Sequence, residues 1–144
     1  MGKVAILIST RNRLSFVKCL LEYYSKLNLK HKIYIGDSSD NEISEEILYY
    51  IENKYTNLDI NYKVYENYRS GIADNLKVIE NLTNYVSEDF ISITGDDDYL
   101  IPRTVERCVK FLEENNNYIS AFGNGKYINF KKILNKNLIE GNYN

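Results

Sequence analysis

Three adjacent aspartates, Asp96, Asp97 and Asp98, follow a short apolar segment and stand just before Pro102. Carboxylates this close repel one another, and the repulsion raises their pKa values unless a cation lies among them. Carboxylate oxygens select hard divalent ions such as Mg²⁺ or Mn²⁺, which keep positions open for substrate phosphates. The run therefore predicts a divalent metal site. A capping role ahead of the helix that begins at Pro102 is the alternative, but it accounts for one carboxylate rather than three.

Three further polar clusters each follow an apolar segment: Ser9 to Arg13, Asp37 to Asp40, and Tyr68 to Gly71. If the apolar segments are parallel strands, all the clusters lie at the carboxyl edge of one sheet, where open α/β sheets bind their ligands. We therefore expect the polar clusters and the aspartates to converge on one cleft. Helix capping, solvation and turn formation remain alternative roles for individual members of these clusters.

The elements that must position these clusters are visible in the hydrophobic pattern. Apolar segments at 4–8, 32–36, 60–65 and 90–94 predict strands, and helical spacing is found at 14–29, 42–54, 71–86 and 102–115. Strands that alternate with helices of this length predict an α/β fold, with an open, mostly parallel sheet and helices on both faces. In the third helix, Ile72, Leu76, Ile79 and Leu82 are expected to form the buried side.

The remainder of the chain gives weaker signals. Residues 119–122 are a possible fifth strand, and residues 131–144 are expected to be a short helix or a loosely ordered tail on a single domain of residues 1–144. Cys19 and Cys108 have no disulfide or metal-ligand spacing, so both are interpreted as buried packing residues in a reducing compartment.

The length and the net charge of the chain limit the classes of protein to which it can belong. The chain has 144 residues, 44% of them hydrophobic, which is sufficient for the core of one domain. The formal net charge is -2, from 18 basic and 20 acidic residues, so charge does not favour nucleic acid as a partner. The apolar segment at 4–8 is too short for a signal peptide or a transmembrane segment, and a cytoplasmic protein is expected.

The four polar blocks resemble, in order, the motifs of family-two glycosyltransferases with the GT-A fold. Residues 91–102 resemble the strand, the acidic metal-binding motif and the proline of that family. The block from Val4 to Arg13 resembles its first strand and Thr-x-Asn-Arg loop, residues 33–40 its second strand, and residues 67–75 its Asn-x-Gly segment. The similarity covers about residues 3 to 115, and four blocks in order are more specific than any one of them.

The resemblance implies a role for each matching residue. Asp97 would be the ligand of Mn²⁺ or Mg²⁺, Asp96 would contact the ribose or a metal-bound water, and Asp98 would assist or cap the next helix. Asp37 would accept a hydrogen bond from a base with an imide N–H, which favours a UDP-sugar over an adenosine donor. The complete set of implied donor-binding residues is Thr10, Arg11, Asn12, Arg13, Asp37, Ser38, Arg69, Gly71, Asn75 and Asp96. The second substrate would be the hydroxyl of a carbohydrate acceptor.

The sequence also departs from the family. Gly95 and Gly36 stand where the family commonly has acidic residues. Family members usually continue into an acceptor-binding half that supplies the general base, and between 116 and 144 the only carboxylate is Glu140. A non-catalytic nucleotide-sugar-binding module, or a subunit completed by a partner, is therefore the main alternative. A phosphotransfer domain would carry its acidic residues after the first strand, and a dinucleotide-binding domain would have Gly-x-Gly-x-x-Gly there.

Overall fold

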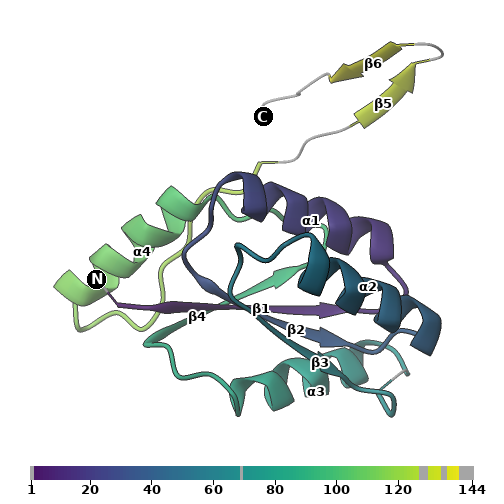
Figure 1. The fold of residues 1–144 in the computed structure, drawn as a ribbon. Coiled ribbons are helices and arrows are strands. Elements are labelled where there is room, and N and C mark those ends of the chain that lie inside the picture. Colours follow the sequence, from purple (N-terminus) through teal and green to yellow (C-terminus); the bar gives the residue numbers. More distant parts are fainter. Residues whose placement is uncertain (1, 69, 127–129, 134–135, 140–144) are drawn as a thin grey trace.

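A four-stranded parallel sheet forms the centre of the molecule (Figure 1). The computed structural model describes residues 2–68, 70–126, 130–133 and 136–139. The strands are β1 (Val4–Thr10), β2 (Lys32–Asp37), β3 (Ile60–Val64) and β4 (Phe90–Gly95), and their order in the sheet is β3-β2-β1-β4. All three pairings are parallel. The predicted α/β fold with an open parallel sheet is confirmed.

Helices cover both faces of this sheet. Helix α1 (Leu14–Lys26), α2 (Asn41–Asn53) and α4 (Pro102–Glu114) lie on one face, and α3 (Ile72–Thr83) lies on the other (Figure 1). Because each helix follows a strand and returns to the amino end of the next, the carboxyl ends of all four strands meet at one edge.

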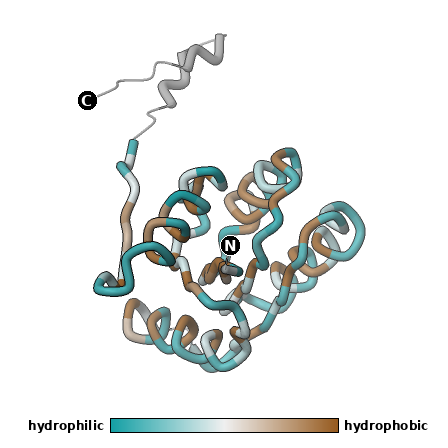
Figure 2. The backbone as a smooth tube through the Cα atoms, turned by 90° about the vertical axis from the view of Figure 1, so that its left-hand side faces the viewer, coloured by the Kyte–Doolittle hydropathy of each residue, from teal (hydrophilic) through white to brown (hydrophobic). Residues whose placement is uncertain are grey.

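The face with three helices contains the larger hydrophobic core. Its buried residues include Ile6 and Ile8 of β1, Leu20 and Leu21 of α1, and Ile47 of α2. These strand residues alternate with others that point to the opposite face, so the middle of each central strand is apolar on both faces. Viewed from the side of the molecule, the hydrophobic parts of the chain gather at the sheet and along the helix sides that face it (Figure 2).

The face covered by α3 has a smaller core, formed by Ala5, Leu7, Tyr34, Ile79 and Leu82. The prediction for this helix was only partly right. Its buried apolar residues are Val78, Ile79 and Leu82, whereas Ile72 and Leu76 are exposed. The reason is that α3 packs mainly on the central strands β1 and β2, so only the side of the helix that faces them is covered.

Three other sequence predictions are corrected. Residues 119–122 are not a strand, and Ile119 is fully exposed because no strand of the described residues pairs with this segment. For the tail, expected as a short helix or a loosely ordered end, the helix alternative is wrong, because β5 (Phe130–Ile133) and β6 (Lys136–Ile139) form an antiparallel pair. Cys19 is exposed and Cys108 is partly buried, because both lie away from the core-facing side of their helices; both are free thiols.

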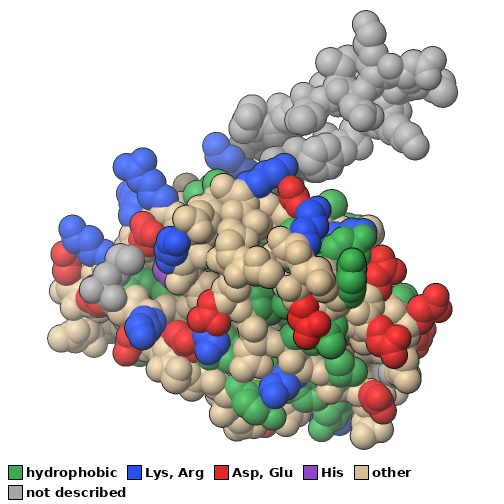
Figure 3. Space-filling model, in the orientation of Figure 1, with side chains coloured by type: hydrophobic (Ala, Val, Ile, Leu, Met, Phe, Trp, Pro, Cys, Tyr) green, Lys and Arg blue, Asp and Glu red, His purple; other side chains and the backbone are tan. Residues whose placement is uncertain are grey.

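Charge and hydrophobicity agree with a compact α/β unit. On the face shown in Figure 3, basic and acidic side chains are interspersed, with no extended basic surface. Within the described part of the chain, none of the helices combines the length and the apolar character needed to cross a membrane.

Candidate functional site

The candidate site lies where the order of the strands reverses. From β1 the chain continues to β2 and β3 on one side, whereas β4 pairs with β1 on the other side. Open α/β sheets bind ligands outside such a switch point. Here the end of β1 and the residue after β4 are joined directly, because the Thr10 hydroxyl donates a 2.7 Å hydrogen bond to Oδ2 of Asp96. Two of the predicted blocks therefore meet.

Arg13 extends this link to the second aspartate. Its Nη1 lies 3.0 Å from Oδ1 of Asp96, and its Nη2 lies 2.8 Å from Oδ2 of Asp97. The loop after β1 and the acidic loop after β4 are thus held together by one guanidinium group. The predicted convergence of these two blocks is observed at the level of single atoms.

The two aspartates differ in their electrostatic environment. Asp96 is buried, and this burial raises its pKa above the ordinary value, against the opposing effects of the Thr10 hydroxyl and the Arg13 charge. Asp97 is exposed, and its hydrogen bond from Arg13 lowers its pKa. The same bond to Asp97 raises the pKa of Arg13. The pair therefore combines one sheltered carboxyl with one solvent-facing carboxylate.

Asp98 does not join this pair. It is exposed, its backbone N–H donates to the carbonyl oxygen of Gly95 at 3.3 Å, and its own carbonyl oxygen accepts a bond from the Thr94 hydroxyl at 3.4 Å. It therefore closes the turn after β4. Within the described residues, no three acidic, histidine or cysteine side chains gather as a ready-made metal cage.

The donor set nevertheless fits a hard divalent ion. Asp96 and Asp97 each place an oxygen against the same cationic group, so both can reach one positive centre. Oxygen ligands suit Mg²⁺ and Mn²⁺, and such ions are commonly bound through one or two carboxylates, with phosphate oxygens and water completing the shell. In this arrangement Asp96 and Asp97 would hold the ion.

Asn12 connects the first loop to the second. Its backbone N–H donates to the Ser39 hydroxyl at 2.7 Å, its side-chain amide donates to Asp40 at 3.1 Å, and its amide oxygen accepts from the Asp40 backbone N–H at 2.9 Å. Asn12 has a φ of 53°, a left-handed conformation that asparagine tolerates better than most residues. Its side chain is thus committed to holding the loop, while Arg11 on one side of it is exposed.

Asp37 lies at the end of β2 and is completely buried. Its Oδ1 accepts the Ser39 backbone N–H at 2.7 Å, and its Oδ2 accepts the Tyr62 hydroxyl at 2.5 Å. Burial and this bond raise the pKa of Tyr62. Ser38 is also buried, and its N–H donates to the carbonyl oxygen of Thr10. Both carboxylate oxygens of Asp37 are therefore engaged within the protein.

The block before α3 lies on the opposite side of the sheet edge. Asn75 accepts a hydrogen bond from the Ser9 hydroxyl, and Asp74 accepts the Ser70 backbone N–H at 2.7 Å. Gly71 has a φ of 86°, which favours glycine, and precedes the helix with open space around it. The predicted residue Arg69 lies outside the described residues.

The two glycines that depart from the family pattern have steric explanations. A Cβ atom at Gly36 would lie 2.3 Å from Cγ1 of Val78, so α3 packs directly on the backbone of β2. A Cβ atom at Gly95 would lie 2.9 Å from Oδ1 of Asp97, so the Asp97 carboxylate would have to move to make room for a side chain. An acidic residue at either position requires a different local arrangement.

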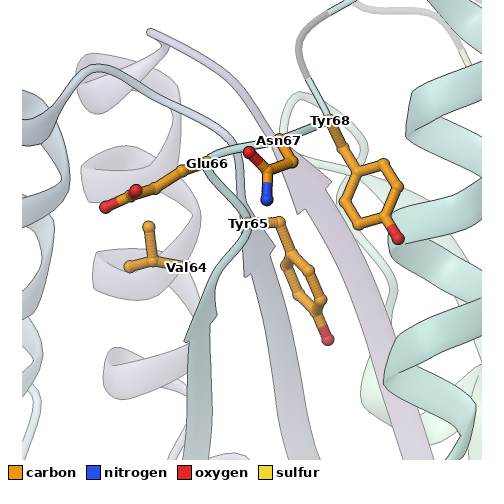
Figure 4. A pocket seen from close by; sticks show the side chains of 5 residues that line it. All are labelled: Val64, Tyr65, Glu66, Asn67 and Tyr68. Atoms are coloured by element: carbon orange, nitrogen blue, oxygen red, sulfur yellow. The ribbon is translucent and has the colours of Figure 1, made fainter.

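A hollow opens beside this edge at the end of β3. It is lined by residues 64–68 and has a volume of about 290 Å³, at the lower end of the range for ligand pockets. The side chains of Tyr65 and Tyr68 point toward α3, while those of Val64 and Glu66 point the other way (Figure 4). The Tyr65 N–H donates to the Asp37 carbonyl oxygen, so the hollow adjoins the end of β2.

Three polar residues at this edge received no individual role from the sequence, although Ser9 belongs to one of the predicted clusters. Tyr62 and Asp74 hold parts of the site from neighbouring elements, and Ser9 binds Asn75. The position of Ser9 at the end of the first strand could have predicted its role, because the same position indicated Thr10 as a site residue. Finding Tyr62 required the pairing of β3 with β2, which places Tyr62 beside Ile35.

Comparisons with known proteins identify the fold. No family model matches the chain, and no curated protein matches it in sequence. Among solved structures, it is similar to a mannosyltransferase, PcManGT from Pyrobaculum calidifontis, in complex with GDP-Man and Mn²⁺. The TM-score is 0.62 at 16% sequence identity, over 77% of this chain and 32% of that one, so this chain spans about a third of the mannosyltransferase. The chain therefore has a glycosyltransferase-like α/β fold.

Proposed function

We propose that this chain is the donor-binding part of a glycosyltransferase, which binds a nucleotide diphosphate sugar with a divalent metal ion for transfer of the sugar to an acceptor hydroxyl. The observation that carries the proposal is the convergence of Thr10, Arg13, Asp96 and Asp97 at the switch point of the sheet. The fold around that point is similar to that of a mannosyltransferase seen with GDP-Man and Mn²⁺. Fold likeness alone does not specify chemistry, so the side-chain geometry is the main support.

Each carboxylate has a distinct part in the proposed site. Asp96 is buried and fixed by Thr10, whereas Asp97 faces solvent, so Asp97 offers the accessible carboxylate and Asp96 lies behind it. Bound there, Mn²⁺ or Mg²⁺ would neutralise the negative charge that develops on the departing diphosphate. The loops after β1 and β4 orient the donor, because positioning lowers the barrier for attack by the acceptor hydroxyl.

Nucleotide selection is assigned to Asp37 and the hollow beyond β3. A base that offers a ring N–H suits a carboxylate acceptor, and both uracil and guanine have one, whereas adenine does not. The GDP-Man in the similar mannosyltransferase complex fits this class. Since both Asp37 oxygens are engaged, the base would share or replace the Tyr62 hydroxyl. We therefore expect uridine or guanosine diphosphates to bind better than the adenosine form.

A non-catalytic binding module is the second candidate. It is favoured by the absence of Asp and Glu from the described residues after α4, since a transferring enzyme of the inverting type needs a carboxylate near the acceptor. The chain would then bind the donor without transferring it, or would be completed by a further part. Binding and transfer must be measured separately to distinguish the two candidates.

The binding test is calorimetry with UDP, GDP and ADP, with Mn²⁺ and with chelator. We expect chelator to abolish binding and Asp97→Asn to weaken it at least roughly tenfold, because even changes beyond the direct ligands cost that much in metal affinity. Asp98→Asn is the matched control and should change affinity less, since Asp98 closes the turn. Chelator-insensitive binding, or equal loss in both variants, would contradict the proposed metal site.

The transfer test uses the purified chain with donor sugars, Mn²⁺ and a panel of sugar acceptors. Slow donor hydrolysis without transfer is expected for a donor-binding part alone. Rapid metal-dependent formation of a glycosylated product would instead show that the chain carries a complete catalytic site, and the binding-module interpretation would then be wrong.

A further inference from the structure

Arg13 occupies the position between the two carboxylates that the proposed metal site would need. Two nitrogens of its one planar guanidinium contact two different aspartates, at 3.0 Å and 2.8 Å. Guanidinium is the side-chain group best suited to bridging carboxylates, since it is planar and always charged. The acidic pair is therefore already neutralised in part by a cation that belongs to the protein itself.

The guanidinium of Arg13 also packs against an aromatic ring. Its central carbon lies 4.1 Å from the centroid of the Phe16 ring, a cation–π contact. Arg13 precedes the first turn of α1, where its carbonyl oxygen accepts the N–H groups of Phe16 and Val17. The backbone of Arg13 is thus fixed, while its side chain is about 38% exposed and has room to move at the tip.

A divalent ion and this guanidinium cannot both bridge the same carboxylate oxygens. Two cations within a few ångströms repel each other, so an ion bound by Asp96 and Asp97 would drive the guanidinium away from at least one of them. A nucleotide diphosphate that arrives with the ion offers the displaced guanidinium a new partner. Paired N–H bonds from arginine to phosphate are among the stronger charge-assisted hydrogen bonds.

We propose that Arg13 is an exchangeable internal cation, which holds Asp96 and Asp97 together without metal and transfers to the donor diphosphate when the metal ion binds. This inference rests on the proposed function and adds a coupling to it. Arg13 opposes binding of the metal alone and supports binding of metal and diphosphate together. The metal and the nucleotide should therefore each increase the affinity for the other, since such coupling is reciprocal.

The test is the variant Arg13→Gln, measured by calorimetry first with Mn²⁺ alone and then with UDP or GDP at saturating Mn²⁺. We expect Mn²⁺ alone to bind about three- to tenfold more tightly, the effect of removing two partly exposed ion pairs. We expect the nucleotide to bind about tenfold more weakly, through loss of a charge-assisted contact. Arg103→Gln, the same change at an exposed residue in the first turn of α4, is the control and should shift neither affinity in this way.

The two measurements separate the possible failures. If Arg13→Gln leaves Mn²⁺ affinity unchanged or weakens it, the exchange is overturned, because Arg13 would then support the metal ligands or play no part. The proposed function survives that result if the wild-type chain still binds nucleotide with Mn²⁺. If the wild-type chain binds neither, both are overturned.

A second measurement does not depend on a variant. In the wild-type chain, the Nη–Hη resonances of Arg13, whose nitrogens contact the aspartates, can be followed at low temperature during titration with Mg²⁺ and then with UDP or GDP. We expect them to shift and lose protection from solvent exchange with Mg²⁺ alone, and to regain protection with nucleotide. Resonances that are unaffected by a saturating amount of Mg²⁺ would overturn the exchange.

Discussion

The two faces of the sheet differ in how completely they are covered. On the face of α1, α2 and α4, a large core buries residues of β1, β2 and all three helices, and partly buried residues of β3 and β4 pack against it. On the face of α3, the core is small, and Ile91 and Ile93 of β4 are exposed beside it, as are Ile72 and Leu76 of α3. Most groups of the candidate site follow this division, although Asp74 of α3 is also buried. Thr10, Asp37 and Asp96 are all buried, whereas Asn75 on the thinner face is exposed.

The difference indicates how the candidate site is kept in place. Thr10 lies on the same side of β1 as Ile6 and Ile8, and Asp37 lies on the same side of β2 as Ile33 and Ile35, because side chains alternate along a strand. The polar groups of the site therefore continue the larger core, on the face of α1, α2 and α4, to the carboxyl edge of the sheet. Packing beneath them limits their movement, which a site that depends on positioning requires.

The largest expected difference in stability between the two faces is tested by a matched pair of Leu→Ala substitutions. Leu20 is 1% exposed on the face covered by α1, α2 and α4 (the thick face), and Leu76 is 65% exposed on the face covered by α3 (the thin face). Leu20→Ala should lower the free energy of unfolding by about 2 to 5 kcal/mol, through lost burial and a new cavity. Leu76→Ala should change it by less than about 0.5 kcal/mol. Urea denaturation of both variants checks this, and equal effects would show that α3 packs differently.

Contact between α3 and the sheet backbone can be tested at Gly36. The methyl group of Gly36→Ala would lie 2.3 Å from Val78, so α3 must shift, and we expect a loss of about 1 to 3 kcal/mol. Gly125→Ala is the control, since its Cβ would meet nothing within 4 Å. Thermal and urea denaturation measure both. An unaltered free energy of unfolding in Gly36→Ala would mean that α3 can move away from β2 at little cost.

A polar contact of the thick face can be removed with Tyr62→Phe. The change deletes the hydroxyl that donates to Asp37 and leaves a buried carboxylate oxygen without that donor. We expect a loss of about 1 to 2 kcal/mol in unfolding free energy. Tyr49→Phe, at a residue that is 61% exposed, should be close to neutral. A neutral Tyr62→Phe would indicate that water or another donor replaces the hydroxyl.

The smallest expected effect is a pH dependence on the thin face. The Ser70 N–H stabilises the Asp74 carboxylate and lowers its pKa below the ordinary value of 3.8. Because the folded pKa is lowered, the stabilisation is present above that value and is lost as pH falls through the folded pKa. The difference in unfolding free energy between wild type and Asp74→Asn should therefore shrink from about pH 6 to about pH 2. A difference that stays constant with pH would contradict this role.

Much of the fold was predictable from sequence because the central strands are buried on both faces. Uninterrupted apolar segments such as 4–8 indicate such strands, and the polar residues after them locate the carboxyl edge. The convergence of Thr10 and Asp96 followed from that logic and is observed. The exposed flank of α3 was not predictable, because periodicity shows that a helix has an apolar side but not how far the sheet extends beneath it.

The side-chain pairings within the site could not be predicted from the sequence, for a related reason. Nothing local indicates that Arg13 would bridge Asp96 and Asp97, since the residues are more than eighty positions apart and an arginine in a loop is usually solvated. The engagement of Asp37 by Tyr62 likewise depends on strand register. Residue types and strand ends predicted the neighbourhood, and only the three-dimensional arrangement assigned partners.

The hydrogen bonds of Asn12 imply a constraint on how related chains can vary. Through Asn12, the loop after β1 and the loop after β2 share three hydrogen bonds with Ser39 and Asp40. An insertion in either loop alone would separate these partners, so the two loops should keep fixed lengths or change together. At the turn before α3, a Cβ atom added to Gly71 would meet nothing within 4 Å, so added residues would meet no steric obstacle at that position. Among homologous sequences, insertions should therefore accumulate before α3 and be rare in the first two loops.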